Sequence, residues 1–208
     1  MCDNCKCSPA EPTTTGLVLA HEELEAGFKR MLQGLKIAYG LDLKDENLRE
    51  TPARVARALL EMLQGIDQTG VEEILKKNFP TNYTGMVVLT DIHCFSMCPH
   101  HFLPVSYKVN FAYIPQGHAL GLSKIPRFIK LLLQAPMLQE DATDAIVDKF
   151  NEYVNASGAM VTLSGQHMCM GCRGVSKPEV LTLTSALRGD FKKPEVRAEF
   201  FTIVENRK

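Results

Sequence analysis

The segment Pro104-Val105-Ser106-Tyr107-Lys108-Val109-Asn110-Phe111-Ala112-Tyr113 alternates between apolar and polar side chains over most of its length. Such alternation predicts a β-strand with one buried face and one polar face. The predicted buried face consists of Val105, Tyr107, Val109, Phe111 and Tyr113, and the polar face of Ser106, Lys108 and Asn110. Pro115-Gln116-Gly117 predicts a turn directly afterwards, and we expect neighbouring strands to be consecutive and antiparallel.

Immediately before this strand, Ser96-Met97-Cys98-Pro99-His100-His101-Phe102-Leu103-Pro104 places one thiol and two imidazoles within four residues. Cys98 and His101 are three apart, a spacing that lets one tight turn direct both side chains at a single metal ion. The stretch Gln166-His167-Met168-Cys169-Met170-Gly171-Cys172-Arg173-Gly174 offers a second group of thiols and another histidine. Spacing alone leaves open which cysteine of the second stretch, and which histidine of the first, is a ligand.

Two ligands from the first stretch and one from the second would make a zinc site with three protein ligands. Structural zinc is usually closed by four protein ligands, whereas three leave a position for water. Bound zinc lowers the pKa of its water to about 7, so that hydroxide is available near neutral pH. The alternative is that these cysteines and histidines only pack in the core or hydrogen-bond. Two clusters in one chain favour the metal site, and the sequence therefore predicts a hydrolytic enzyme.

Composition limits the other function classes. The chain has 208 residues, 45% hydrophobic, with a formal net charge of −1, which fits one domain with or without a small helical appendage. Charges of both signs are interspersed, so we expect no nucleic-acid or membrane partner. No apolar run approaches the roughly 20 residues of a membrane span, and the polar N-terminus lacks a signal-peptide core. We expect a cytoplasmic protein whose seven cysteines are metal ligands and reduced thiols, not disulfides.

Three regions are expected along the chain: a flexible tail over residues 1–16 with Cys2, Cys5 and Cys7, a helical region over 17–80, and a catalytic domain over 81–208. Hydrophobic periodicity and punctuation predict the elements within them. The predicted helices span His21–Tyr39, a segment from Thr51 (N-cap) to Gly65, Val71–Lys77, a segment from Ser123 to about Pro136, Leu138–Asn155 and Pro194–Val204; the further predicted strands are Met86–Leu89, Ala159–Leu163 and Glu179–Thr184.

Several charged residues are candidates for substrate binding. Lys124 and Arg127 lie near the start of a helix that Ser123 can cap, and a helix N-terminus with two cations suits phosphate. The alternative is an amphipathic helix whose basic residues face water. By default, Arg54 belongs to a solvated helix face and Gln139-Glu140 is a surface pair.

Taken together, these stretches resemble GTP cyclohydrolase I, the zinc enzyme that converts GTP and water to 7,8-dihydroneopterin triphosphate and formate. The resemblance covers roughly residues 20–205. It is carried by Glu50–Ala56, Ser96–His101, Gly121–Ile125, Gln139-Glu140, His167–Met170 with Arg173–Val175, and Thr184-Ser185, in the family's order. Any one segment is weak evidence, whereas the ordered set is specific.

The resemblance implies a role for each candidate residue. The implied zinc ligands are Cys98, His101 and Cys169; the implied catalytic residues are His100, His167 and Ser123; the implied substrate-binding residues are Arg54, Lys124, Arg127, Gln139, Glu140 and Arg173. Glu140 matches the carboxylate that recognises guanine. Opening the imidazole ring requires water to add at C8 while a histidine protonates the ring nitrogen. Cys172 is then not a ligand.

The resemblance also implies an α+β architecture called the tunnelling fold: a four-stranded antiparallel sheet with two helices on one face, plus N-terminal helices. Subunits of the family form pentameric barrels that stack into a homodecamer with active sites between subunits. This chain departs from the family at Pro99, where many members have glutamate, and at Ala135 and Asp141, where arginines are common. The alternative functions are a tunnelling-fold relative with different purine or pterin chemistry, or a non-catalytic zinc-containing nucleotide-binding protein.

Overall fold

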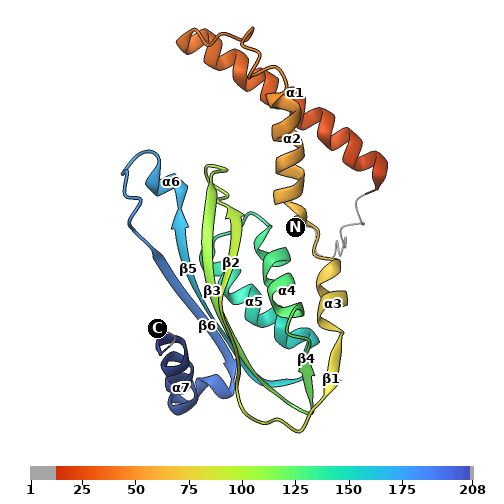
Figure 1. The fold of residues 1–208 in the computed structure, drawn as a ribbon, viewed down its shortest axis with the longest axis vertical. Coiled ribbons are helices and arrows are strands. Elements are labelled where there is room, and N and C mark those ends of the chain that lie inside the picture. The colour runs from red at the N-terminus through yellow and green to blue at the C-terminus, as the bar shows by residue number, and fades with distance from the viewer. Residues whose placement is uncertain (1–12, 207–208) are drawn as a thin grey trace, which may run out of the picture. The chain divides into compact units, whose positions relative to one another are not determined.

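The computed structural model describes residues 13–206, which form two compact units, one ending at Asp67 and the other beginning at Gln68. Figure 1 labels the elements. In chain order they are α1 (Thr14–Tyr39), α2 (Thr51–Met62), the 3-10 helix η1 (Gln64–Ile66), α3 (Gly70–Leu75), β1 (Asn78–Pro80), β2 (Val87–Met97), β3 (Pro104–Pro115), β4 (His118–Leu120), α4 (Lys124–Leu133), α5 (Gln139–Tyr153), β5 (Ala156–His167), α6 (Met168–Gly171), β6 (Thr182–Gly189), the 3-10 helix η2 (Asp190–Lys192) and α7 (Pro194–Glu205).

The first unit consists of α1, α2 and η1. Helix α1 starts at Thr14 and not at His21, because the Thr13 hydroxyl accepts a hydrogen bond from the Gly16 N–H at 3.0 Å and caps the helix. Its first turn therefore includes residues that the sequence assigned to the tail; Cys2, Cys5 and Cys7 lie outside the described residues. Helix α1 ends at Gly40, whose φ of 72° suits glycine. The cap residue of α2 is Glu50, one position before the predicted Thr51.

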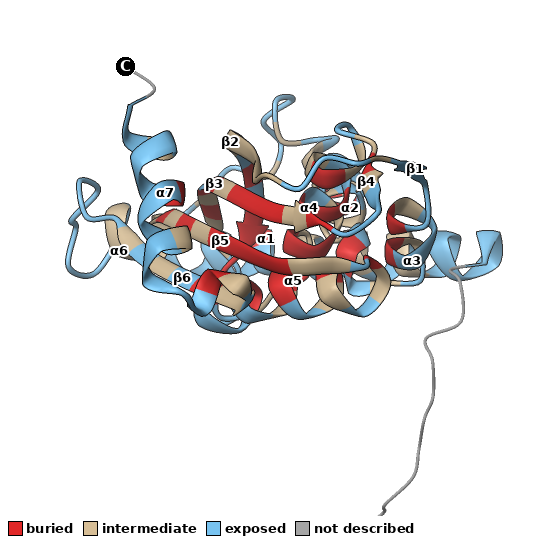
Figure 2. Ribbon diagram, turned by 90° about the horizontal axis from the view of Figure 1, so that it is seen from below, coloured by how far each residue is buried: buried red, intermediate tan, exposed pale blue. Residues whose placement is uncertain are grey.

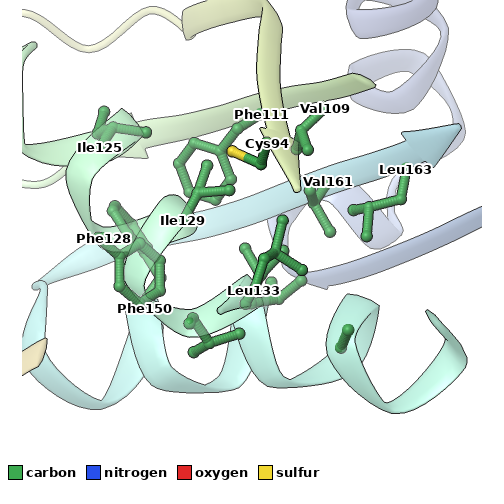
Figure 3. Packing of buried hydrophobic residues seen from close by; sticks show 14 of the residues in the cluster. Cys94, Val109, Phe111, Ile125, Phe128, Ile129, Leu133, Phe150, Val161 and Leu163 are labelled. Carbon is green, nitrogen blue, oxygen red and sulfur yellow. The ribbon is translucent and has the colours of Figure 1, made fainter. Parts of the chain in front are cut away.

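The second unit is built on a four-stranded antiparallel sheet of order β2-β3-β5-β6. Helices α4 and α5 cover one face (Figure 1). The predicted alternation in β3 is confirmed on this face, where the side chains from Val105 to Tyr113 at every second position are buried. They pack against apolar residues of both helices, including Phe128 and Phe150 (Figure 3). Helix α3, which the sequence grouped with the N-terminal helices, adds Val71 and Leu75 to this core.

The opposite face of the sheet is partly covered by α7. Phe200 of α7 packs with Phe191, with Ala112 of β3 and with Met160 of β5, and all four side chains are buried. The predicted polar residues Ser106, Lys108 and Asn110 are not buried, whereas Ala112, the next residue on that face, lies beneath α7. Figure 2 shows the resulting burial along β3 and β5.

The predicted strands are present, but their limits differ. Strand β2 extends to Met97, so that Cys98 of the first cysteine–histidine stretch directly follows the strand. The last strand covers Thr182–Gly189 and not Glu179–Thr184; before it, the Pro178 carbonyl accepts a hydrogen bond from Gln166 Nε2 at 2.8 Å. A separate two-stranded sheet pairs β1 with β4. Within residues 13–206, no helix is long and apolar enough to cross a membrane. The α+β class with antiparallel sheets is confirmed.

Candidate functional site

The first part of the site is the turn that joins β2 to β3. The Cys98 N–H donates to the Leu103 carbonyl and the Phe102 N–H donates to the Cys98 carbonyl, both at 2.9 Å. Phe102 adopts a left-handed φ of 52° to close the turn. Cys98 is buried at the end of the strand, whereas His100 and His101 are exposed. One tight turn thus carries the thiol and both imidazoles of the first stretch.

The second part of the site is the junction between β5 and α6. His167 is the last residue of β5 and pairs in register with Val105, at the start of β3. Cys169 follows in α6. Since β3 lies between β2 and β5 in the sheet, the two cysteine–histidine stretches meet at the same end (Figure 1).

Three side chains at this end form a group that can hold a metal ion. One potential ligand atom from each of Cys98, His167 and Cys169 lies within 4.8 Å of the others. The two sulfurs are 3.7 Å apart. Two sulfurs bound to one tetrahedral zinc at 2.3 Å would be separated by about 3.8 Å. The spacing of the thiols therefore fits zinc without rearrangement.

The other two histidines lie beside this group. His100 Nδ1 is 3.7 Å from Cys98 Sγ. His101, the ligand implied by the resemblance, is outside the three-residue group, and Arg173 Nη1 donates to its Nε2 at 3.2 Å. In this structure His101 is thus engaged by a guanidinium, and its role as a ligand stays a prediction.

Burial sets the electrostatics of the group. Burial raises the pKa of the Cys169 thiol, and the neighbouring Cys98 raises it further. Burial lowers the pKa of His167, which the negative charge of Glu140 partly opposes. Burial also raises the pKa of Tyr107, whose ring centroid is 6.2 Å from that of His167, to about 12. At neutral pH the uncharged imidazole of His167 is therefore favoured.

Gln139 and Glu140 are the first two residues of α5, and Gln139 reaches the end of the sheet that holds the cysteines. Glu140 is exposed, as expected for a residue that meets a ligand. Gln139 is 3% exposed, so the default interpretation of a surface pair is wrong for it. Its Oε1 is 2.9 Å from His167 Nε2.

The predicted phosphate-binding residues lie at the other end of the sheet. Ser123, Lys124 and Arg127 follow β4, and the Leu120 N–H donates to the hydroxyl of Tyr113 at 2.9 Å. In β3, Tyr113 comes eight residues after Val105, the partner of His167. At about 3.3 Å per residue this is about 26 Å. The Ser123 side chain makes no capping hydrogen bond, so the predicted cap is not formed.

The second unit also has a surface hollow, and the first unit contains the predicted substrate-binding residue Arg54. A surface hollow of about 470 Å³ is lined by Asn155, Gly158 and Gly189 among others, at the end of the sheet where Tyr113 lies, and is not part of the cysteine–histidine site. Arg54 belongs to the first unit, where its guanidinium pairs with the Glu50 carboxylate at 2.7 Å.

Sequence reasoning missed the residues that hold the Gln139 side chain next to His167. Thr182 and Thr184 of β6 accept hydrogen bonds from Gln139 Nε2, at 2.9 and 3.0 Å. Gly165 of β5 leaves the space into which the Gln139 amide oxygen fits. Thr184 lies in one of the segments that carry the resemblance, but nothing in the sequence pattern indicates Gly165.

The fold and the site define an α+β chain with a metal-competent cysteine–histidine cluster at one end of an antiparallel sheet. The GTP cyclohydrolase I family model matches residues 26–205. The chain belongs to this family.

Named relatives agree with the family model. GTP cyclohydrolase 1 of Clostridium perfringens (strain 13 / Type A) is 41% identical over 174 residues, which cover 84% of this chain and 91% of that protein. GTP cyclohydrolase 1 of Streptococcus pneumoniae (strain ATCC 700669 / Spain 23F-1) is 42% identical over 171 residues, covering 82% and 90%. Among solved structures, the apo form of the archaeosine synthase QueF-Like aligns with a TM-score of 0.41 and 21% identity, over 50% of this chain and 93% of that chain.

Proposed function

We propose that this protein is a zinc-dependent GTP cyclohydrolase I, which converts GTP and water to 7,8-dihydroneopterin triphosphate and formate. The observation that carries the proposal is the pair of thiols 3.7 Å apart, brought together with His167 in a chain of the GTP cyclohydrolase I family. The relatives named above carry the same activity in their names.

Cys98, His101 and Cys169 are the proposed zinc ligands. Two protein thiolates and one imidazole, with one open position, are a ligand set that zinc accepts in catalytic sites. When bound there, zinc supplies hydroxide near neutral pH for addition to C8 of guanine. His101 would have to exchange its contact with Arg173 for the metal, which would free that guanidinium for the substrate.

His100 and His167 are the proposed proton-transfer residues. His167 has its pKa lowered by burial, so its neutral ring can take up a proton and then deliver it to the imidazole nitrogen of guanine. Protonation there makes C8 electrophilic. His100 is exposed on the turn and lies next to Cys98, where it can move a second proton.

The charged residues are proposed to bind and orient GTP. The exposed carboxylate of Glu140 can accept hydrogen bonds from N1–H and the 2-amino group of guanine, a donor pair that adenine lacks. The position of Glu140 in α5 supports this, because the preceding residue, Gln139, contacts the His167 ring. The proposed triphosphate ligands are Arg54, Lys124, Arg127 and Arg173, and Ser123 is proposed as a further catalytic residue.

We further propose that the complete site needs more than one copy of the chain. Lys124 and Arg127 follow β4 at one end of the sheet, whereas Cys98 and Cys169 lie at the other (Figure 1). One GTP molecule is too short to span about 26 Å along a strand. Strands β2 and β6 are the sheet's edges within residues 13–206, so each can pair with a neighbouring copy. A barrel-shaped homo-oligomer, as in the family's decamer of two pentamers, would satisfy both observations.

The test is turnover of GTP by purified protein loaded with zinc. We expect formate and a pterin that becomes fluorescent after oxidation, in equal amounts, and loss of both after zinc is removed by a chelator. Binding of zinc and GTP without either product would contradict the proposal and support a non-catalytic nucleotide-binding protein.

A further inference from the structure

The side-chain amide of Gln139 has only one orientation that satisfies its surroundings. Its Nε2 donates to the Thr182 carbonyl at 2.9 Å and to Thr184 Oγ1 at 3.0 Å, and a third acceptor, the Leu163 carbonyl, is 3.4 Å away. Turning the amide over would place its oxygen against two carbonyl oxygens in a site that is 3% exposed. The two N–H groups are therefore committed to Thr182 and Thr184 of β6, with the Leu163 carbonyl of β5 nearby.

A hydroxyl pair fixes this orientation further. Thr143 Oγ1 donates to the Gln139 backbone carbonyl at 2.6 Å and is 2.7 Å from Thr184 Oγ1. With that proton committed, Thr184 donates to Thr143, and the Thr184 oxygen is left to accept from Gln139. Each hydrogen bond among Gln139, Thr143 and Thr184 then has one donor and one acceptor.

The oxygen of the same amide determines the state of His167. Gln139 Oε1 can only accept, and it lies 2.9 Å from His167 Nε2. The proton of a neutral His167 ring is therefore on Nε2, and Nδ1 keeps its lone pair. The ring is also bounded by Tyr107, whose ring meets it edge to face with an interplanar angle of 84°.

Gly165 leaves the space for this contact. A Cβ built on Gly165 would overlap Gln139 Oε1 and would come within 2.8 Å of Cε1 of Tyr107. Gly165 lies near the end of β5, paired with both Tyr107 of β3 and Thr182 of β6. The reason for glycine at this position is thus the approach of the Gln139 amide.

We propose that Gln139 is a positioning residue for His167: it holds the ring in place and keeps Nδ1 as the nitrogen that takes up a proton or meets a metal ion. This differs from the sequence-based prediction that Gln139 binds substrate, because both of its N–H groups and its oxygen are used within the protein. The inference rests on the proposed function only in the chemical role given to His167.

The first test separates positioning from substrate binding in the zinc-loaded oligomer. Gln139→Met keeps the volume of the side chain but removes both ends of the amide. Mutating a residue that hydrogen-bonds a histidine of a metal site typically lowers activity or metal affinity about 10- to 100-fold. We expect kcat to fall by about that factor with KM for GTP within twofold and with zinc content unchanged. A rise in KM at constant kcat would overturn the proposal and restore the substrate-binding role.

A double-mutant comparison tests whether Gln139 acts through His167. In a His167→Ala background, Gln139→Met should change the residual rate by less than twofold, because the group that it positions is gone. If the double variant instead lost the product of the two single-variant rate losses, the two residues would act independently and the proposal would be contradicted. Tyr113→Phe is the matched control, since it also removes one buried hydrogen bond but at the far end of β3. It should lower the melting temperature without the selective loss in kcat.

A second variant and a direct measurement cover the remaining outcomes. If Gln139→Met fails to fold, Gly165→Ala displaces the amide oxygen from the opposite side and should reproduce the loss in kcat. Ring nitrogen NMR of histidine-labelled protein reports the tautomer without any turnover, and the signal missing from His167→Ala identifies the residue. The Nε2–H tautomer in the wild type, lost in Gly165→Ala, would support the inference even if GTP is not converted. The Nδ1–H tautomer would overturn it, independently of the proposed function.

Discussion

Cys98 Sγ and Cys169 Sγ lie 3.7 Å apart although 71 residues separate them in the chain. Cys98 follows β2 and Cys169 follows β5, and these strands run antiparallel to the same intervening strand, β3. The sheet therefore brings both thiols to one end. This relationship leads to a direct test of which cysteines hold the metal.

We expect Cys98→Ala and Cys169→Ala each to lose tightly bound zinc and to lower GTP turnover by at least about 1,000-fold, because two ligands cannot keep a catalytic zinc. Zinc per chain, measured by atomic absorption, and formate release are the readouts. Cys172→Ala is the matched control, since Cys172 is exposed and lies outside the three-residue group. Zinc loss in the control and not in Cys169→Ala would mean that the other thiol of the second stretch is the ligand.

The third ligand can be identified by comparing two histidine variants. The structure places His167 in the metal-competent group, whereas the resemblance implies His101, which here accepts a hydrogen bond from Arg173. We expect His101→Ala to lose zinc, and His167→Ala to retain it while kcat falls by about 100-fold or more, as for a proton-transfer residue. Zinc retained by His101→Ala and lost by His167→Ala would reverse the two roles.

The sequence predicted local structure better than it predicted the supporting contacts. Alternation in β3 identified its buried residues because the pattern is local, but the burial of Ala112 depends on α7, which comes much later in the chain. The spacing of Cys98 and His101 predicted a turn that can present ligands. The burial of Gln139 depends on how α5 meets β5 and β6, and such a long-range register cannot be read from a polar pair at a helix start.

Cys94 should differ from the other described cysteines in its reactivity. It lies in the apolar core near Phe111 (Figure 3), and burial raises its thiol pKa to about 11. At pH 8 about one molecule in a thousand then carries the thiolate. We expect iodoacetamide to modify Cys172 quickly and Cys94 only after unfolding, as measured by mass spectrometry of the peptides.

The raised pKa of Cys94 also predicts that the protein loses stability as the pH rises. Because the folded state favours the neutral thiol, the stability linked to Cys94 is present below the unfolded pKa of about 9 and is lost as the pH rises toward about 11. Cys94→Ala should therefore weaken the loss of stability between pH 9 and 11, measured as the melting temperature at each pH. An unchanged dependence, or fast alkylation of Cys94 in the folded protein, would contradict the burial of this thiol.

The last prediction concerns the separation of Lys124 from Cys169 along the sheet. Both variants Lys124→Ala and Cys169→Ala should be inactive or strongly impaired by themselves, the first in triphosphate binding and the second in zinc. If one site takes its cysteines from one copy and its α4 residues from another, mixed oligomers contain some sites with two intact halves. Random mixing of equal amounts gives about one quarter of such sites.

Co-expression of the two variants should therefore restore about a quarter of the wild-type turnover. The pair Cys98→Ala with Cys169→Ala is the control, because both changes damage the same half and no arrangement of copies repairs it. Recovery in the first mixture alone would show that α4 and the cysteines of one site come from different copies. Equal absence of recovery in both mixtures would mean that Lys124 serves the cysteines of its own chain. The separation of about 26 Å between Val105 and Tyr113 along β3 of one chain, at about 3.3 Å per residue, argues against that outcome.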